Sequence, residues 1–283
     1  MKKKICSPLQ YCMYCGKSGP ESFTDEHVIA ECMGGELIIP NSTCSACSAI
    51  TSKIELLIAR GALYEARAKF NTQSKRRKNY PKTLPVKLMI GKYGPEKVVE
   101  VPINEAPIFV IIPHYSCFRI ENENLYSICQ LTATAMDEDD NRESFTKLFA
   151  KYNVHSAEAV TRSIEAEVFV RMLWKSAYGF FWITDQESVK GSKIAQYILG
   201  GLRPFHSEAS KNGKLLAINL TSQNRTRSND FKASARIYSM GQEGDKFIYC
   251  ELDFMSPFGL PKYTCRIKNL SLTPIDEVLY SVF

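Results

Sequence analysis

The first sixty residues combine two kinds of hydrophobic pattern. Short apolar runs at 24–30 and 36–40 indicate strands, and Gly34-Gly35 between them suits a tight turn because glycine tolerates positive φ. From residue 44 to 70, apolar positions recur at helical spacing. The pattern predicts a compact unit with the order strand, turn, strand and helix.

The rest of the chain mixes strand and helix patterns. Residues 84–131 are rich in β-branched side chains and are punctuated by Gly and Pro, which is typical of strands. An acidic stretch at 136–143 is expected to be a loop. Apolar residues at helical spacing then predict a long helix over 157–178 and a shorter one near 188–199, and strand-like segments return from 214 onward. We therefore expect an α+β fold.

Composition indicates a globular protein that does not cross a membrane. The 283 residues are 45% hydrophobic, and no apolar run approaches the roughly 18 to 20 residues that span a bilayer. The basic N-terminus lacks the apolar stretch of a secretory signal, so we expect a cytoplasmic location. We predict a cysteine-bearing domain at 1–60, a basic helical extension at 61–83, and a larger α+β domain at 84–283 that recognises a target, partner or signal.

Four of the ten cysteines form two Cys-x-x-Cys pairs, Cys12/Cys15 and Cys44/Cys47. Each pair has the spacing with which two thiolates hold one tetrahedral zinc. A redox role would instead require a single Cys-x-x-Cys that opens a helix in a larger βαβ pattern. We expect one structural Zn²⁺ per chain, in a closed four-cysteine site without an open position for substrate.

Positive charge is concentrated in the first third of the chain. The net charge is +6, and residues 1–100 hold 16 Lys and Arg against 9 Asp and Glu, whereas the remainder holds 20 against 21. Residues 66–95 contain nine basic residues and no acid. Such a run is often a solvated face or linker, but directly after a candidate metal site we interpret it as an arm that binds phosphate. Its densest part is Lys75, Arg76, Arg77 and Lys78.

The segment "DEHVIAECMGG…PNSTCSACSAITSK" resembles the HNH endonuclease family, specifically its zinc-containing ββα-metal branch, in the order of its cysteine pairs, acid-His step, diglycine and helix. The resemblance implies that His27 is the general base that activates water. It also implies that Glu26, or Asp25 in its place, helps to bind one divalent cation such as Mg²⁺ or Mn²⁺. This division suits phosphodiester hydrolysis, which requires a positioned nucleophile and a cation that neutralises charge on the phosphate.

Two residues depart from the pattern of that family. The metal ligand that usually follows the second cysteine of the helix is a His or Asn, and here it is Ser48, whose hydroxyl is a weak ligand for Mg²⁺. Asn41 lies three residues before Cys44, closer than is usual, so it is either a catalytic-site residue or a turn residue. Lys53 matches a basic position that contacts phosphate, and Glu55 is interpreted as a surface acid.

We therefore predict a metal-dependent endonuclease that hydrolyses DNA, with RNA left open as a substrate and with a role in restriction or phage defence. An HNH unit usually nicks one strand, so a double-strand break would imply a homodimer, and a defence role would imply a defence-system partner protein. The alternative is a zinc-containing nucleic-acid-binding module without nuclease activity, for which Ser48 is the best support. A third reading, a protein-interaction scaffold, would show no affinity for nucleic acid.

Overall fold

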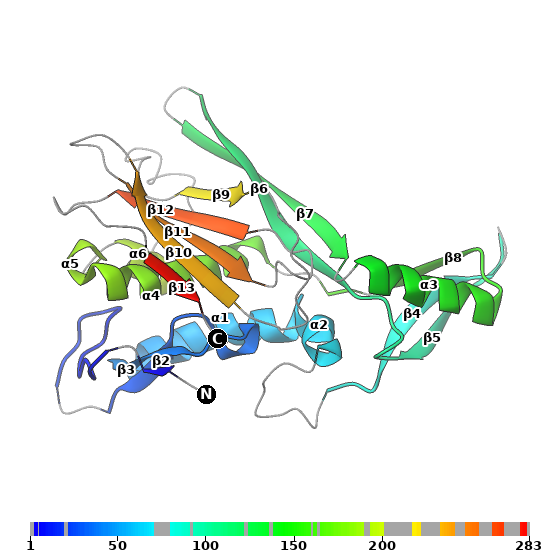
Figure 1. The fold of residues 1–283 in the computed structure, drawn as a ribbon, viewed down its shortest axis with the longest axis horizontal. Helices are drawn as coiled ribbons and strands as arrows, with labels where there is room; N and C mark the ends of the chain where they lie inside the picture. The colour runs from blue at the N-terminus through cyan, green and yellow to red at the C-terminus, as the bar shows by residue number, and fades with distance from the viewer. Residues whose placement is uncertain are drawn as a thin grey trace.

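The computed structural model describes most of the chain. The described residues are 3–4, 6–19, 22–70, 80–90, 93–121, 124–135, 138–159, 161–162, 165–189, 193–200, 217–221, 233–240, 247–254, 262–268 and 278–281. Helices and strands are both abundant among them, so the α+β prediction is confirmed (Figure 1).

The N-terminal unit has the predicted order of elements. Strands β2 and β3 pair antiparallel, and β1 adds to β3 in parallel. The turn between β2 and β3 contains Gly34 at φ 85°, while a Cβ on Gly35 would lie 1.9 Å from the carbonyl oxygen of Ile29. The φ of Gly34 favours glycine, and only glycine fits at position 35. The helix that follows is interrupted at Gly61, which separates α1 from α2. The elements are β1 (Lys3–Lys4), β2 (Thr24–His27), η1 (Glu31–Met33), β3 (Leu37–Thr43), α1 (Ser45–Arg60) and α2 (Tyr64–Lys69).

A small lobe follows, in which α3 packs beside the three-stranded sheet β5-β4-β8. The prediction of an acidic loop is wrong from residue 138 onward, because these residues form the first turns of α3. Acidic side chains at the start of a helix interact favourably with the positive end of the helix dipole. The side chain of Asn141 hydrogen-bonds both the N–H and the C=O of Ile108 at 2.7 Å and so attaches α3 to the preceding strand region. The elements are β4 (Thr83–Met89), β5 (Glu96–Pro102), α3 (Glu138–Tyr152) and β8 (Ser156–Ala159).

The remaining strands form a hairpin and a five-stranded antiparallel sheet. The hairpin pairs β6 with β7, and the sheet has the order β13-β10-β11-β12-β9. The elements are β6 (Phe109–Glu121), β7 (Asn124–Ala135), β9 (Ala217–Thr221), β10 (Ala233–Met240), β11 (Phe247–Phe254), β12 (Lys262–Lys268) and β13 (Val278–Ser281).

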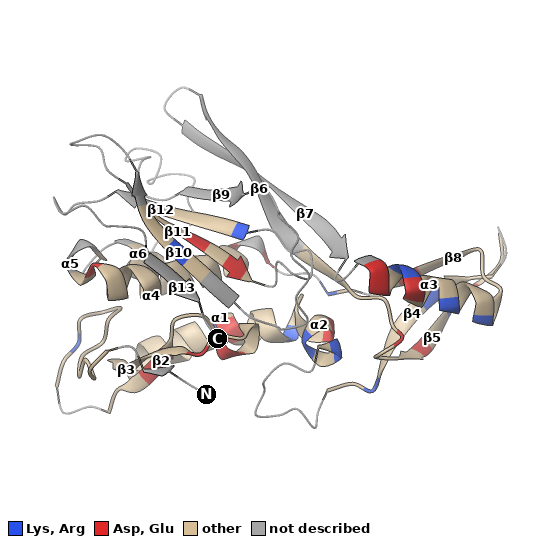
Figure 2. Cartoon of the chain, in the orientation of Figure 1, with Lys and Arg blue, Asp and Glu red and all other residues tan. Residues whose placement is uncertain are grey.

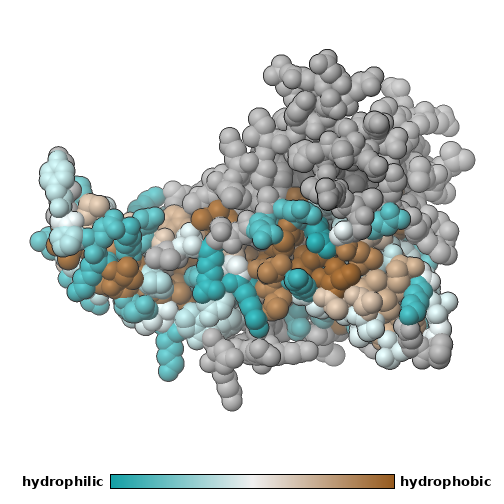
Figure 3. Space-filling view, turned by 180° about the vertical axis from the view of Figure 1, so that it is seen from behind, coloured by the Kyte–Doolittle hydropathy of each residue, from teal (hydrophilic) through white to brown (hydrophobic). Residues whose placement is uncertain are grey.

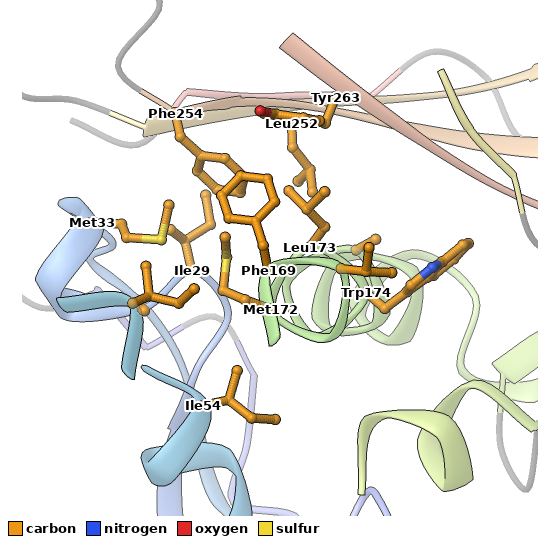
Figure 4. Packing of buried hydrophobic residues seen from close by; sticks show 14 of the residues in the cluster. Ile29, Met33, Ile54, Phe169, Met172, Leu173, Trp174, Leu252, Phe254 and Tyr263 are labelled. Atoms are coloured by element: carbon orange, nitrogen blue, oxygen red, sulfur yellow. The ribbon is translucent and has the colours of Figure 1, made fainter. Parts of the chain in front are cut away.

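Helix α4 (Ala166–Thr184) lies between this sheet and the N-terminal unit (Figures 1 and 4). The helix predicted at 157–178 begins later than expected, because residues 156–159 form strand β8. After Asp185 two short helices follow, α5 (Gln186–Val189) and α6 (Lys193–Ile198). Nearly every residue of α4 from Val168 to Trp182 is buried, with Arg171 among the exceptions. A helix that is apolar around most of its circumference requires cover on several sides.

One hydrophobic cluster joins the N-terminal unit, α4 and the sheet. Figure 4 shows Ile29, Met33 and Ile54 on the side of the N-terminal unit, and Phe169, Met172 and Leu173 on α4 beneath the sheet. On the face of the molecule that is hidden in Figure 1, hydrophobic residues also reach the surface near the middle (Figure 3). Within the described residues, no helix is long and apolar enough to cross a membrane.

Candidate functional site: a four-cysteine cluster beside a buried ion network

The four cysteines of the two Cys-x-x-Cys pairs come together at the start of α1. Their sulfur atoms all lie within 4.8 Å of one another. Cys12 and Cys15 lie in a tight loop in which Gly16 N–H donates to the Cys12 carbonyl, and Cys44 and Cys47 lie at the N-terminal end of α1. A 2.8 Å hydrogen bond from Met13 N–H to the Ser42 carbonyl joins the loop to β3.

The geometry and the acidity of these thiols fit a tetrahedral metal such as zinc. Zinc–sulfur bonds of about 2.3 Å give tetrahedral edges of about 3.8 Å, and the sulfur atoms of Cys15 and Cys44 are 3.8 Å apart. Burial raises the pKa of the Cys12 and Cys47 thiols. Burial also acts to raise the pKa of Cys44, but hydrogen bonds from the Cys47 N–H and from neighbouring thiols lower it overall. A bound cation would displace the remaining thiol protons and stabilise the thiolates.

The acid-His step lies at the end of β2, beside an irregularity in the pairing with β3. Asp25 is exposed, and its Oδ1 accepts a 3.1 Å hydrogen bond from the backbone N–H of Asn41. Asn41 has φ 48° and an exposed side chain. Because asparagine tolerates the left-handed region better than most residues do, this backbone geometry explains its presence at the bulge.

Glu26 differs from Asp25 because its carboxylate is buried inside the protein. One oxygen accepts a 3.0 Å hydrogen bond from the hydroxyl of Thr43, and the other lies 2.6 Å from Nζ of Lys175 on α4. Tyr14, within the first cysteine pair, is also hydrogen-bonded to Glu26. Burial, followed by the charge of Glu26, raises the pKa of this tyrosine well above its ordinary value. Both carboxylate oxygens of Glu26 are thus engaged by the protein.

Lys175 is the residue that sequence reasoning missed. Its Nζ also lies 2.8 Å from the carboxylate of Glu55 and donates a 2.6 Å hydrogen bond to the backbone carbonyl of His27. The interpretation of Glu55 as a surface acid is therefore wrong, since its side chain is only 25% exposed and faces this network. Figure 2 shows acidic residues on both β2 and α1, the two elements that Lys175 joins.

Other residues of α4 contact the N-terminal unit along the same stripe as Lys175. The Tyr178 hydroxyl donates a 2.6 Å hydrogen bond to the Met13 carbonyl, next to Cys12. A Cβ on Gly179 would lie 2.9 Å from Val28, directly after His27. The Trp182 ring lies 6.2 Å from that of Tyr11. Positions 175, 178, 179 and 182 have helical i, i+3, i+4, i+7 spacing, which places them on one face of α4.

The remaining predicted site residues are distributed over the N-terminal unit. His27 is half-buried at the end of β2, Ser48 is half-buried in the first turns of α1, and Lys53 is exposed on α1. Lys75, Arg76, Arg77 and Lys78 lie outside the described residues.

Two basic residues of the predicted phosphate-binding arm serve the fold instead. Arg67 is buried and donates a 3.0 Å hydrogen bond to the Ala59 carbonyl. Lys69 forms an ion pair with Asp140 of the small lobe. The positive charge available for phosphate is therefore smaller than the count of basic residues suggests.

Residues 12–54 match a family model described as HNH endonuclease. The match begins at Cys12, the first cysteine of the cluster, and includes β2, β3 and much of α1, so the predicted resemblance is confirmed for this segment. No curated protein and no solved structure matches the chain. The match associates this segment with nuclease-type function and hence with a nucleic-acid substrate.

Proposed function

We propose that the protein is a metal-dependent HNH endonuclease that hydrolyses DNA phosphodiester bonds. The observation that carries the proposal is the four-cysteine cluster inside the matched segment, which joins the loop before β2 to the start of α1. One structural zinc held by Cys12, Cys15, Cys44 and Cys47 would fix this arrangement, because such a site contributes directly to folding. A location in the cytoplasm suits a zinc site of four cysteines, because thiols stay reduced there.

In the proposed reaction His27 takes a proton from the attacking water. The phosphodiester would lie beside the end of β2, where His27 is half-buried and its backbone carbonyl is fixed by Lys175. Lys53, exposed on α1, would contact the phosphate backbone, as would the basic residues at 75–78. Fixing the base before substrate arrives is the contribution of the protein, since orientation supplies much of a catalytic effect.

Asp25 or Glu26 would bind the catalytic Mg²⁺ or Mn²⁺, and when bound this cation stabilises negative charge on the phosphate and the leaving oxygen. An exposed carboxylate such as Asp25 is the hard oxygen ligand that these ions prefer. Ser48 offers only a hydroxyl, which is suited to a contact through water.

A binding module without nuclease activity is the second candidate. Two observations favour it, the serine at position 48 and the engagement of Glu26 by Lys175. In this case the protein would bind nucleic acid with a steep salt dependence and would cleave nothing.

Cleavage of supercoiled plasmid separates the two candidates. The purified zinc-containing protein is incubated with Mg²⁺, Mn²⁺ or EDTA, and binding is followed in parallel by gel shift at several salt concentrations. Nicking that requires the divalent cation supports the endonuclease. A salt-sensitive gel shift with intact plasmid in every lane supports the binding module, and the absence of both would refute both candidates. Single-stranded DNA and RNA in the same assay define the substrate class.

A further inference from the structure

The ammonium of Lys175 is completely satisfied within the protein. An ammonium group has three N–H donors and no acceptor. The three acceptors at 2.6 to 2.8 Å are the carboxylates of Glu26 and Glu55 and the carbonyl of His27. The lysine is 1% exposed, so water does not compete for these donors.

A cation between two carboxylates is the arrangement expected of a divalent metal site, and here a side chain supplies the positive charge. Without Lys175, two carboxylates from β2 and α1 would face each other with little access to water, which is unfavourable for both charges. With Lys175 in place, a metal ion would have to displace a buried, fully hydrogen-bonded ammonium. Since Thr43 occupies the other oxygen of Glu26, this carboxylate has little capacity left for a metal.

The alternation of side chains along β2 points to the other acid. Glu26 and His27 pair in register with Ile39 and Ile38 of β3, so their side chains face opposite sides of the strand, whereas Asp25 lies at the irregularity in that pairing. The burial of β2 agrees, since Asp25 is exposed and His27 is half-buried, whereas Glu26 is buried. The exposed carboxylate near the candidate base is therefore that of Asp25.

We propose that Lys175 is a positioning residue of the candidate nuclease site, and that its ammonium takes the place of a divalent cation between Glu26 and Glu55. Glu26 then helps to hold Lys175, which fixes the backbone of His27, and Asp25 is the acid that binds the catalytic cation. This inference rests on the proposed function, because it assigns the roles of the acids in that same site.

Binding of Mn²⁺ tests the inference without an activity assay. The zinc-containing full chain is titrated with Mn²⁺, and free Mn²⁺ is measured by electron paramagnetic resonance. We expect Asp25→Asn to weaken binding by roughly tenfold or more and Glu26→Gln to change it by less than about threefold. Lys175→Met should gain one Mn²⁺ site per chain, and Lys175→Met with Glu26→Gln should lose that additional site.

Two outcomes would overturn the inference. One is a loss of Mn²⁺ affinity in Glu26→Gln as large as that in Asp25→Asn, and the other is a folded Lys175→Met protein without an additional site. Circular dichroism establishes folding, and if Lys175→Met does not fold, the comparison of the two acid variants still decides. If the wild type binds no Mn²⁺ and cleaves nothing, the proposed function fails. The gain of a Mn²⁺ site in Lys175→Met would still test whether the ammonium takes the place of a cation between Glu26 and Glu55.

Cleavage kinetics supply the second readout. A positioning role predicts that Lys175→Gln lowers kcat by roughly tenfold or more and leaves KM for DNA within about twofold. Lys147→Gln is the matched control, because Lys147 forms an exposed ion pair with Glu143 on α3, away from the site. A loss confined to KM would contradict positioning.

Discussion

Lys175 Nζ donates a 2.6 Å hydrogen bond to the backbone carbonyl of His27, which lies 148 residues earlier in the chain. The family match covers residues 12–54, so a helix far outside it holds the candidate catalytic strand. In this protein the HNH segment is therefore packed and oriented by the region that follows it.

The Lys175 network predicts a defined dependence of stability on pH. Burial alone lowers the pKa of this ammonium, but the charges of Glu26 and Glu55 and the hydrogen bonds to them raise it overall above its ordinary 10.5. A raised lysine pKa contributes stability that is fully present below the unfolded value and is lost as pH rises through the folded value. We expect Lys175→Met to lose about 3 to 5 kcal/mol of unfolding free energy at pH 8, a difference that stays constant to about pH 10 and then shrinks.

Urea denaturation of both proteins between pH 8 and 11 measures this difference. Groups outside the Lys175 network titrate alike in both proteins, so their effects cancel in the comparison. A difference that already shrinks between pH 8 and 9 would contradict a raised pKa for Lys175.

The close approach of α4 to β2 predicts the effect of Gly179→Ala. Alanine in a helix is normally about 1 kcal/mol better than glycine. Here its Cβ would lie 2.9 Å from Cγ1 and 3.3 Å from Cα of Val28, and such overpacking costs about 1 to 3 kcal/mol. We expect a net loss of about 0 to 2 kcal/mol in thermal or urea unfolding, relieved when Val28→Ala is added.

Ser176→Ala is the control for that substitution, since its hydroxyl is buried on the same helix and has no hydrogen-bond partner among the described residues. It should leave stability unchanged or raise it slightly. If Gly179→Ala were stabilising, the helix would not lie as close to Val28 as the structure places it.

The N-terminal unit was predictable because its signals are local. Cysteine spacing, the diglycine turn and helical periodicity each involve residues near one another in sequence, and the structure has all three. The Lys175 network was not predictable in this way, because a lysine within an apolar helix has no local partner that reveals its role. The ion pair of Glu55 was missed for the same reason, since its partner Lys175 lies on α4, which packs against α1.

Element boundaries failed where two patterns overlapped. Residues 157–159 fall within the predicted helix but belong to β8, which pairs with β4. Strand pairing over a long sequence separation decided the outcome there. The division into domains at 60 and 83 stays a prediction.

Loss of one cysteine of the cluster should release zinc and destabilise the protein. We expect one zinc per chain in the wild type and in Cys6→Ser, whose exposed cysteine lies outside the cluster. Cys47→Ser should retain much less zinc and unfold at lower temperature, because structural zinc contributes folding free energy directly. Metal analysis by mass spectrometry and thermal unfolding measure both. Stoichiometric zinc in Cys47→Ser would contradict the assignment.

Two substitutions of Asn41 distinguish a catalytic-site residue from a turn residue. Its φ of 48° is easy for glycine and costs alanine about 1 to 2 kcal/mol. Because its side chain is exposed and its N–H binds Asp25, we predict that Asn41→Gly keeps both stability and cleavage, whereas Asn41→Ala loses stability. Unfolding and plasmid nicking are compared for the two variants. Loss of cleavage in a stable Asn41→Gly protein would show that the amide acts in the reaction.

The most direct test of the central claim is the rate at which the zinc-containing protein nicks supercoiled plasmid in Mg²⁺ when His27 is replaced. If His27 is the general base, His27→Ala should nick about 10² to 10⁴ times more slowly than the wild type, with unchanged zinc content and plasmid binding, and added imidazole should restore part of the rate. Nicking by His27→Ala at the rate of the wild type would contradict the account.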